Sequence, residues 1–129
     1  MADVYRAEMP GAAGFVKEVA LKVIRGSHSQ EHALLSMFID EARLASRLSH
    51  GNIVQVFEFD QVAGRYYIAM ELVRGRTLRE LSDACRAQAR PLGLPRSLHI
   101  VGEVAKALAY AHRLTENGAP LEVVHRDVS

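Results

Sequence analysis

A lysine inside an apolar strand pattern is the feature that most constrains this chain. Residues 18–24 read Glu-Val-Ala-Leu-Lys-Val-Ile, and this β-branched, apolar composition predicts a strand. Alternate side chains of a strand share a face, so Lys22 lies on the face of Ala20 and Ile24. An ammonium group among apolar neighbours needs an anionic partner. The fold must therefore bring an anion to this strand, and the small Ala20 leaves room beside the cation for a flat group.

Composition excludes several classes of protein. The chain has 129 residues, of which 49% are hydrophobic and 24% charged, as in a soluble globular domain. No apolar run approaches the ~20 residues of a membrane span, and the first residues lack the pattern of a signal peptide. A net charge of +1 gives no reason to expect a nucleic-acid partner. The single Cys85 excludes an internal disulfide and fits a reducing compartment, so we expect a cytoplasmic location.

The order of predicted elements indicates an α+β fold. Strands and turns dominate the first half, and helices dominate the second, which is typical of two layers or two lobes. Hairpin turns are expected at residues 9–14 and 60–64, where glycine and proline gather. The predicted strands are 3–8, 15–24, 53–59 and 66–73, and the predicted helices are 30–48, 78–85 and 97–114.

Glu41 is the candidate partner of Lys22. Helical periodicity over residues 30–48 places several apolar residues on one stripe, and Glu41 takes its middle position. The apolar members of the stripe are Leu34, Met37, Phe38, Leu44, Ala45 and Leu48. In an isolated helix such a glutamate would lie at the edge of the stripe and reach solvent. Because an inward lysine precedes it, we expect Glu41 to be shielded from water and to pair with Lys22.

Three short motifs, the first of which contains Lys22, follow one another along the chain. Val19-Ala20-Leu21-Lys22 comes first, Met70-Glu71-Leu72-Val73 ends the last predicted strand, and His125-Arg126-Asp127 lies near the end of the chain. With Glu41 between them, these motifs resemble the signatures of a eukaryotic-like Ser/Thr protein kinase domain of the bacterial type. The resemblance covers essentially the whole chain, from the end of the glycine-rich loop to the start of the catalytic loop.

The resemblance implies roles for individual residues. Lys22 would hold the α- and β-phosphates of ATP, and Glu41 would fix Lys22. Asp127 would be the catalytic base that accepts or orients the proton of a substrate hydroxyl. The remaining ATP-binding positions are the apolar residues Val4 and Ala20 at the adenine ring, the gatekeeper Met70, and the hinge residues Glu71 and Val73.

The resemblance also implies a division into two lobes, a set of cofactors and the absence of some family motifs from this chain. Residues 1–73 would form a kinase-like N-lobe, an antiparallel sheet with one helix, and residues 74–129 would form the hinge exit and the first helices of a C-lobe. ATP and Mg²⁺ would be the cofactors and a protein with Ser or Thr the substrate. The chain ends before the family's metal-binding Asn and D-F-G motifs, so it offers no metal ligand of that pattern. We therefore expect this polypeptide alone to be inactive.

Two other functions remain open from the sequence. A non-catalytic module, either a pseudokinase or a remnant of a kinase, would keep Lys22, Glu41 and Asp127 without using them. A small-molecule phosphotransferase of the same fold is the third possibility. The His-Arg-Asp form and the hinge residues favour a protein substrate over a small molecule.

Overall fold

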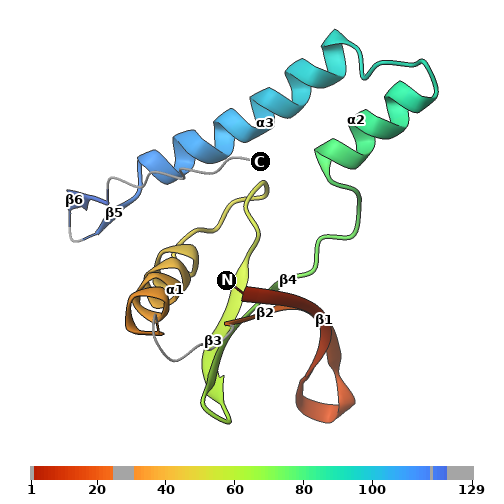
Figure 1. Cartoon of the computed structure of the whole chain (residues 1–129). Coiled ribbons are helices and arrows are strands. Elements are labelled where there is room, and N and C mark those ends of the chain that lie inside the picture. Colours follow the sequence, from red (N-terminus) through yellow and green to blue (C-terminus); the bar gives the residue numbers. More distant parts are fainter. Residues whose placement is uncertain (1, 25–30, 117, 122–129) are drawn as a thin grey trace. The chain divides into compact units, whose positions relative to one another are not determined.

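The computed structural model describes residues 2–24, 31–116 and 118–121 and divides into two compact units (Figure 1). The first unit comprises residues 1–49 and 53–73, and the second comprises residues 50–52 and 74–129. The short loop 50–52 thus belongs to the second unit, although the residues on both sides of it belong to the first.

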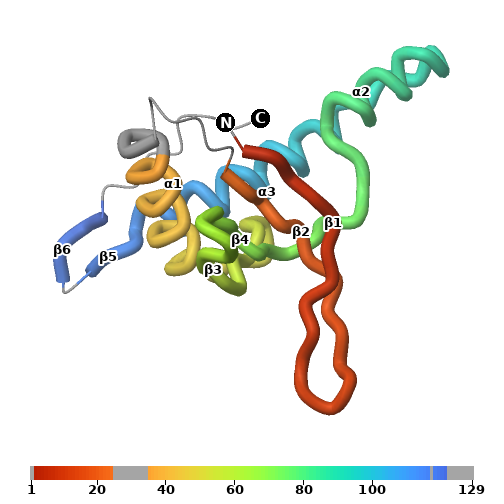
Figure 2. Tube along the Cα trace, turned by 60° about the horizontal axis from the view of Figure 1, so that its bottom comes forward, coloured from red at the N-terminus to blue at the C-terminus, as the bar shows by residue number. Residues whose placement is uncertain are grey.

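The first unit is built on a four-stranded antiparallel sheet in the order β1-β2-β4-β3. Its strands are β1 (Ala2–Pro10), β2 (Val16–Ile24), β3 (Val56–Val62) and β4 (Arg65–Glu71). β1 and β2 pair along their whole length, whereas β2 pairs with β4 only from Val19 to Val23. The distal half of the β1–β2 hairpin therefore projects beyond the sheet (Figure 2).

Helix α1 (Glu31–Ala45) supplies the core of this unit. Phe38 and Ala42 lie one turn apart and pack against Ile68 of β4, and all three are buried. Phe59 adds an aromatic contact, with its ring centroid 6.1 Å from that of Phe38 and 5.7 Å from that of Tyr66. This packing fixes which side of α1 faces the sheet.

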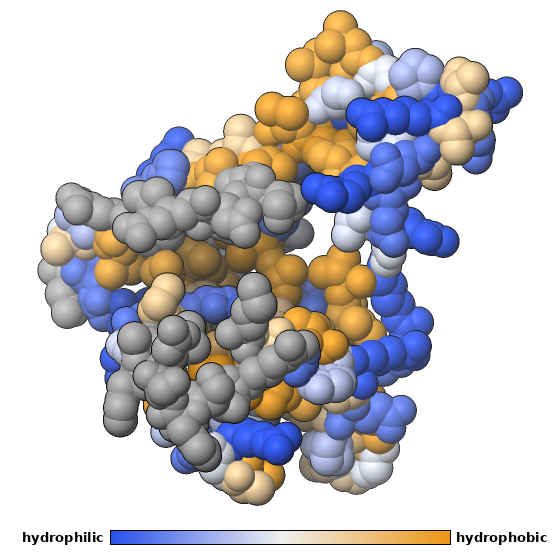
Figure 3. Space-filling model, in the orientation of Figure 1, coloured by the Kyte–Doolittle hydropathy of each residue, from blue (hydrophilic) through white to orange (hydrophobic). Residues whose placement is uncertain are grey.

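The second unit contains the helices α2 (Leu78–Ala87) and α3 (Leu94–His112) and a minimal hairpin of β5 (Thr115–Glu116) and β6 (Ala119–Pro120). A capping box starts α2: the Thr77 side chain accepts a hydrogen bond from the Glu80 N–H, and the Glu80 carboxylate accepts one from the Thr77 N–H. The first turns of α3 expose the apolar residues Leu94, Leu98 and Val101 (Figure 3). Among the described residues, no helix has the length and apolarity needed to cross a membrane.

The α+β fold class is confirmed, and three details differ from expectation. α3 begins at Leu94 rather than at residue 97, because Pro95 is well suited to the first turn of a helix. β3 runs from Val56 to Val62, later than the predicted strand 53–59. Phe38 of the predicted stripe is buried as expected, but the expected burial of Met37 is wrong, since this residue is 68% exposed. The centre of the buried face lies on Phe38 and Ala42, one residue beyond Met37 and Glu41.

The core of the first unit gives a stability prediction. Replacing Phe38 by alanine removes a buried ring and should lower the free energy of unfolding by about 3–5 kcal/mol. The neighbouring substitution Met37→Ala is the matched control and should change it by about 0.5 kcal/mol or less, because that side chain is largely in water. Urea unfolding followed by circular dichroism measures both, and equal losses would contradict the described packing of α1.

The capping box of α2 gives a pH prediction. The Thr77 backbone N–H, and then its side chain, hold the pKa of Glu80 below its usual range. A carboxylate with a lowered pKa in the folded state stabilises that state above its unfolded pKa of about 4.3, and this contribution is lost as the pH falls through the folded value. The stability difference between the wild type and Glu80→Gln should therefore be largest at neutral pH and vanish in acid. A difference that stays constant in urea unfolding from pH 7 to pH 3 would refute this role of Glu80.

Candidate active site

Lys22 belongs to an inner strand of the sheet in the first unit. It projects from β2, opposite Val4 on β1 and Ile68 on β4. Residues directly opposite each other in an antiparallel pair share a face. Because Ile68 packs against Phe38, this shared face is the one that α1 covers.

The structure brings Lys22 and Glu41 together. The Lys22 Nζ lies 2.5 Å from the Glu41 Oε1, and the two residues come from different elements, β2 and α1. The ammonium also lies 5.8 Å from the centroid of the Phe38 ring, within the range of a cation–π contact. Phe38 stands three residues before Glu41 and hence on the same side of the helix. The sequence pattern did not reveal this contact of Phe38 with the ammonium.

The pair is more exposed to water than the sequence predicts. The Lys22 side chain is 26% exposed and that of Glu41 is 53% exposed, so the expectation that Glu41 is shielded from water is wrong. The cause is the displaced buried face of α1, which places Glu41 at the margin of the packed surface. Ion pairs that remain accessible to water contribute about 1 kcal/mol or less. The pair therefore serves to orient the ammonium more than to stabilise the fold.

A strip of small and apolar side chains continues from the ammonium. Ala20, two residues before Lys22 on β2, is buried and lies opposite Met70 of β4. Val4 lies opposite Lys22 on β1 and is 63% exposed. The alternation of strand side chains puts Val4, Ala20, Lys22 and Met70 on one face of three adjacent strands. The predicted binding of a flat group beside the cation stays a prediction, and the register shows only that these four residues share a face.

The end of β4 leaves backbone groups available beside this strip. The Glu71 N–H already donates to the Gln55 carbonyl at 2.8 Å, and the Glu71 carboxylate accepts from the Gln55 N–H at 3.4 Å. Val73 lies beyond the strand with its side chain 65% exposed. Within the described part of the chain, its backbone forms no hydrogen bond with another residue.

The remaining predicted residue, Asp127, lies outside the described residues, together with His125 and Arg126. The described residues also contain no group of three or more His, Cys, Asp or Glu side chains that could hold a metal ion. The described residues thus present a cation at one end of an apolar strip, with the backbone groups of Val73 beyond the end of β4. Such a surface can hold a flat, apolar ring system that carries an anionic group.

Comparison with known proteins gives the family. The sequence profile of the family described as "Protein kinase domain" matches residues 11–129. The chain is 38% identical over 130 residues to the tyrosine-protein kinase MasK of Myxococcus xanthus and 34% identical over 128 residues to the serine/threonine-protein kinase PrkC of Bacillus subtilis. These matches cover 100% and 99% of the chain, but only 20% and 18% of the two relatives.

A solved structure agrees with the sequence matches. The PknI kinase domain of Mycobacterium tuberculosis superimposes with a TM-score of 0.69 at 32% identity, over 99% of this chain and 46% of that one. The chain therefore spans about a fifth of the curated relatives and just under half of this kinase domain. The family profile, the bacterial relatives and the shared fold together show that this chain belongs to the protein kinase domain family.

Proposed function

We propose that this chain is part of an ATP-dependent protein serine/threonine kinase, which transfers the γ-phosphoryl group of ATP to a protein hydroxyl. The observation that carries this proposal is the 2.5 Å contact between Lys22 and Glu41 on the face that also carries Ala20. Phosphoryl transfer depends on positioning and on charge stabilisation, and an oriented ammonium contributes to both. Membership of the kinase family supports the same activity.

Nucleotide binding would use the strip described above. The Lys22 ammonium would hold the α- and β-phosphates, with Glu41 limiting the motion of its flexible stem. Val4 and Ala20 would contact the adenine ring, and Met70 would limit the depth of its pocket. Since the Glu71 N–H is already engaged, Glu71 would offer its carbonyl to adenine, while Val73 would offer both of its backbone groups.

The chemical step would use Asp127 as the base that orients the substrate hydroxyl. Mg²⁺, when bound, would neutralise charge on the transferred phosphoryl group. The described residues form no cluster that could ligate this ion. We assign the phosphoryl transfer to a protein whose kinase domain contains residues 1–129, with residues 1–73 as its N-lobe and 74–129 as the hinge exit and start of its C-lobe.

We also propose that the hydroxyl that accepts the phosphoryl group belongs to a serine or threonine. PrkC is named a serine/threonine kinase, whereas MasK, with higher identity, is named a tyrosine kinase. The His-Arg-Asp form of residues 125–127 is compatible with either acceptor. We favour a serine or threonine acceptor because PknJ of Mycobacterium tuberculosis, which is 38% identical to this chain, is named a serine/threonine-protein kinase, as PrkC is. We also propose a cytoplasmic location, where ATP is available.

Nucleotide binding tests the role of Lys22. Lys22→Met should weaken binding of an ATP analogue by about 10- to 100-fold, the equivalent of one charge-assisted hydrogen bond. Lys17→Met is the matched control, because Lys17 belongs to the same strand and carries the same charge, but its Nζ lies 3.3 Å from the centroid of the Phe57 ring. Isothermal titration calorimetry of the two variants should show a loss for Lys22→Met alone. Equal losses in both would indicate a general charge effect and refute the assigned role.

Phosphoryl transfer tests the role of Asp127 and the acceptor type. In the protein whose kinase domain contains this segment, Asp127→Asn should lower kcat by at least about 100-fold, because the base is lost while nucleotide binding persists. Phosphoamino-acid analysis of a labelled general substrate should give phosphoserine or phosphothreonine. Phosphotyrosine alone would overturn the Ser/Thr assignment, and an unchanged kcat would remove Asp127 from the mechanism.

A further inference from the structure

Residues 74–96 of the second unit carry a concentrated positive charge. They include six arginines and two acidic residues, so their net charge is +4, and the rest of the chain carries a net charge of −3. The arginines are Arg74, Arg76, Arg79, Arg86, Arg90 and Arg96, and the acidic residues are Glu80 and Asp83. All six arginines are exposed, and strongly hydrophilic side chains accordingly border α2 in Figure 3.

Ion pairs within the stretch neutralise little of this charge. The Glu80 carboxylate lies 3.8 Å from the Arg76 guanidinium, and the Asp83 carboxylate lies at the same distance from that of Arg86. These distances are long for charge-assisted hydrogen bonds. The two arginine side chains are 79% and 78% exposed, so water screens both contacts. The Arg79 side chain forms no hydrogen bond or ion pair within the described part of the chain.

The arginines at the start of α2 do not serve the stability of that helix. Arg76 directly precedes the N-cap residue Thr77, and Arg79 lies in the first turn. The amino-terminal end of a helix carries a partial positive charge, so a cation is unfavourable there. Residues that break a local stability rule are expected mainly at functional surfaces. These two positions therefore favour a role in binding over a role in folding.

The chain enters the basic stretch directly from the apolar strip of the first unit. Val73 is the last residue of that unit, and Arg74 follows it in sequence. Ile68 of β4 lies opposite Lys22, and from there the chain runs away from the ammonium group toward Val73. The arginines thus follow the end of the strip that is remote from Lys22, and they are not part of the phosphate contact assigned to that lysine.

We propose that residues 74–96 bind an acidic segment of the protein substrate, a stretch rich in Asp and Glu near the hydroxyl that accepts the phosphoryl group. A guanidinium presents paired N–H donors that match the two oxygens of a carboxylate, and several exposed arginines can bind several carboxylates at once. The description of this segment as part of a kinase substrate rests on the proposed function. The binding of acidic polypeptide by the arginines does not.

An acidic polypeptide fits this surface better than a nucleic acid or a membrane does. Residues 74–96 contain no Phe, Tyr, Trp or His, so they offer no ring on which a base could stack. For the same reason they lack the aromatic side chains that are typical of helices bound in a membrane surface, and α2 is only 10 residues long. Charge complementarity to carboxylates is the property that remains.

Peptide binding by the complete chain tests the proposal without nucleotide. The probe is a fluorescein-labelled peptide with one serine between two runs of glutamate, and the matched peptide has glutamine in place of every glutamate. Fluorescence anisotropy should show binding of the acidic peptide that is at least about tenfold tighter. Raising the NaCl concentration from about 50 mM to about 500 mM should remove most of this difference, because salt screens exposed charges.

Charge variants locate the binding surface. One variant removes three charges at the start of the basic stretch: Arg74→Gln, Arg76→Gln and Arg79→Gln. The matched control removes three exposed charges elsewhere: Arg43→Gln, Arg65→Gln and Arg113→Gln. The first variant should bind the acidic peptide about tenfold more weakly, and the control should change the affinity less than about twofold. If the first variant does not fold, Arg79→Gln combined with Arg90→Gln tests the same stretch.

Three outcomes would overturn the proposal. They are equal affinity for the two peptides, equal losses in the variant and its control, and tighter binding of single-stranded DNA or phosphatidylserine vesicles than of the acidic peptide. In the protein whose kinase domain contains this chain, the first variant should raise KM for the acidic peptide about tenfold and leave kcat unchanged. If that protein phosphorylates no peptide, the proposed function fails, while the anisotropy measurements still decide whether the arginines bind acidic polypeptide.

Discussion

The candidate site depends on how one ammonium group is accommodated on the face of a sheet. Lys22 extends from an inner strand among apolar side chains, where an unpaired charge would be costly. Glu41 of α1 supplies the partner, and the packing of Phe38 and Ala42 on Ile68 sets where that partner can lie. Because the pair remains accessible to water, it contributes little to stability and mainly orients the ammonium.

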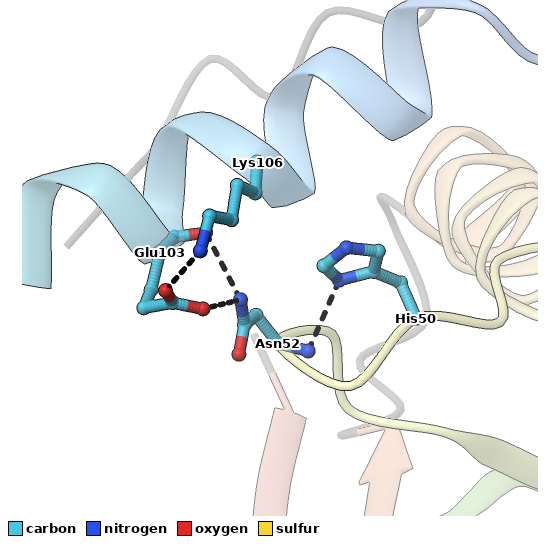
Figure 4. A network of polar contacts seen from close by, with 4 residues as sticks. All are labelled: His50, Asn52, Glu103 and Lys106. Carbon is cyan, nitrogen blue, oxygen red and sulfur yellow. Dashed lines mark hydrogen bonds and ion pairs between the residues drawn. The ribbon is translucent and has the colours of Figure 1, made fainter.

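Much of this arrangement could be predicted from local sequence patterns. The rest could not, because it depends on contacts between residues that are far apart in the sequence. The β-branched run around Lys22 and the 3.6-residue period around Glu41 depend on neighbours in sequence, so the strand, the helix and the pairing of the two residues could be predicted. The one-residue displacement of the buried face of α1 could not, because it depends on how Phe38 meets Ile68 and Phe59 on the sheet. For the same reason, the hydrogen bonds from the Asn52 side chain to Glu103 within the second unit could not be predicted, because the two residues lie 51 positions apart and no local pattern signals their contact (Figure 4).

The most direct test of the central claim is an NMR titration of the ¹⁵N-labelled chain with ATP and, separately, with adenosine. The claim is that Lys22, oriented by Glu41, binds the phosphates at the end of a strip that binds the base. It predicts that both ligands shift the amide signals of Ala20 and Val73, whereas only ATP shifts those of Lys22 and Glu41. Equal shifts of Lys22 with both ligands, or ATP-induced shifts that leave β2 and the end of β4 unaffected, would contradict it.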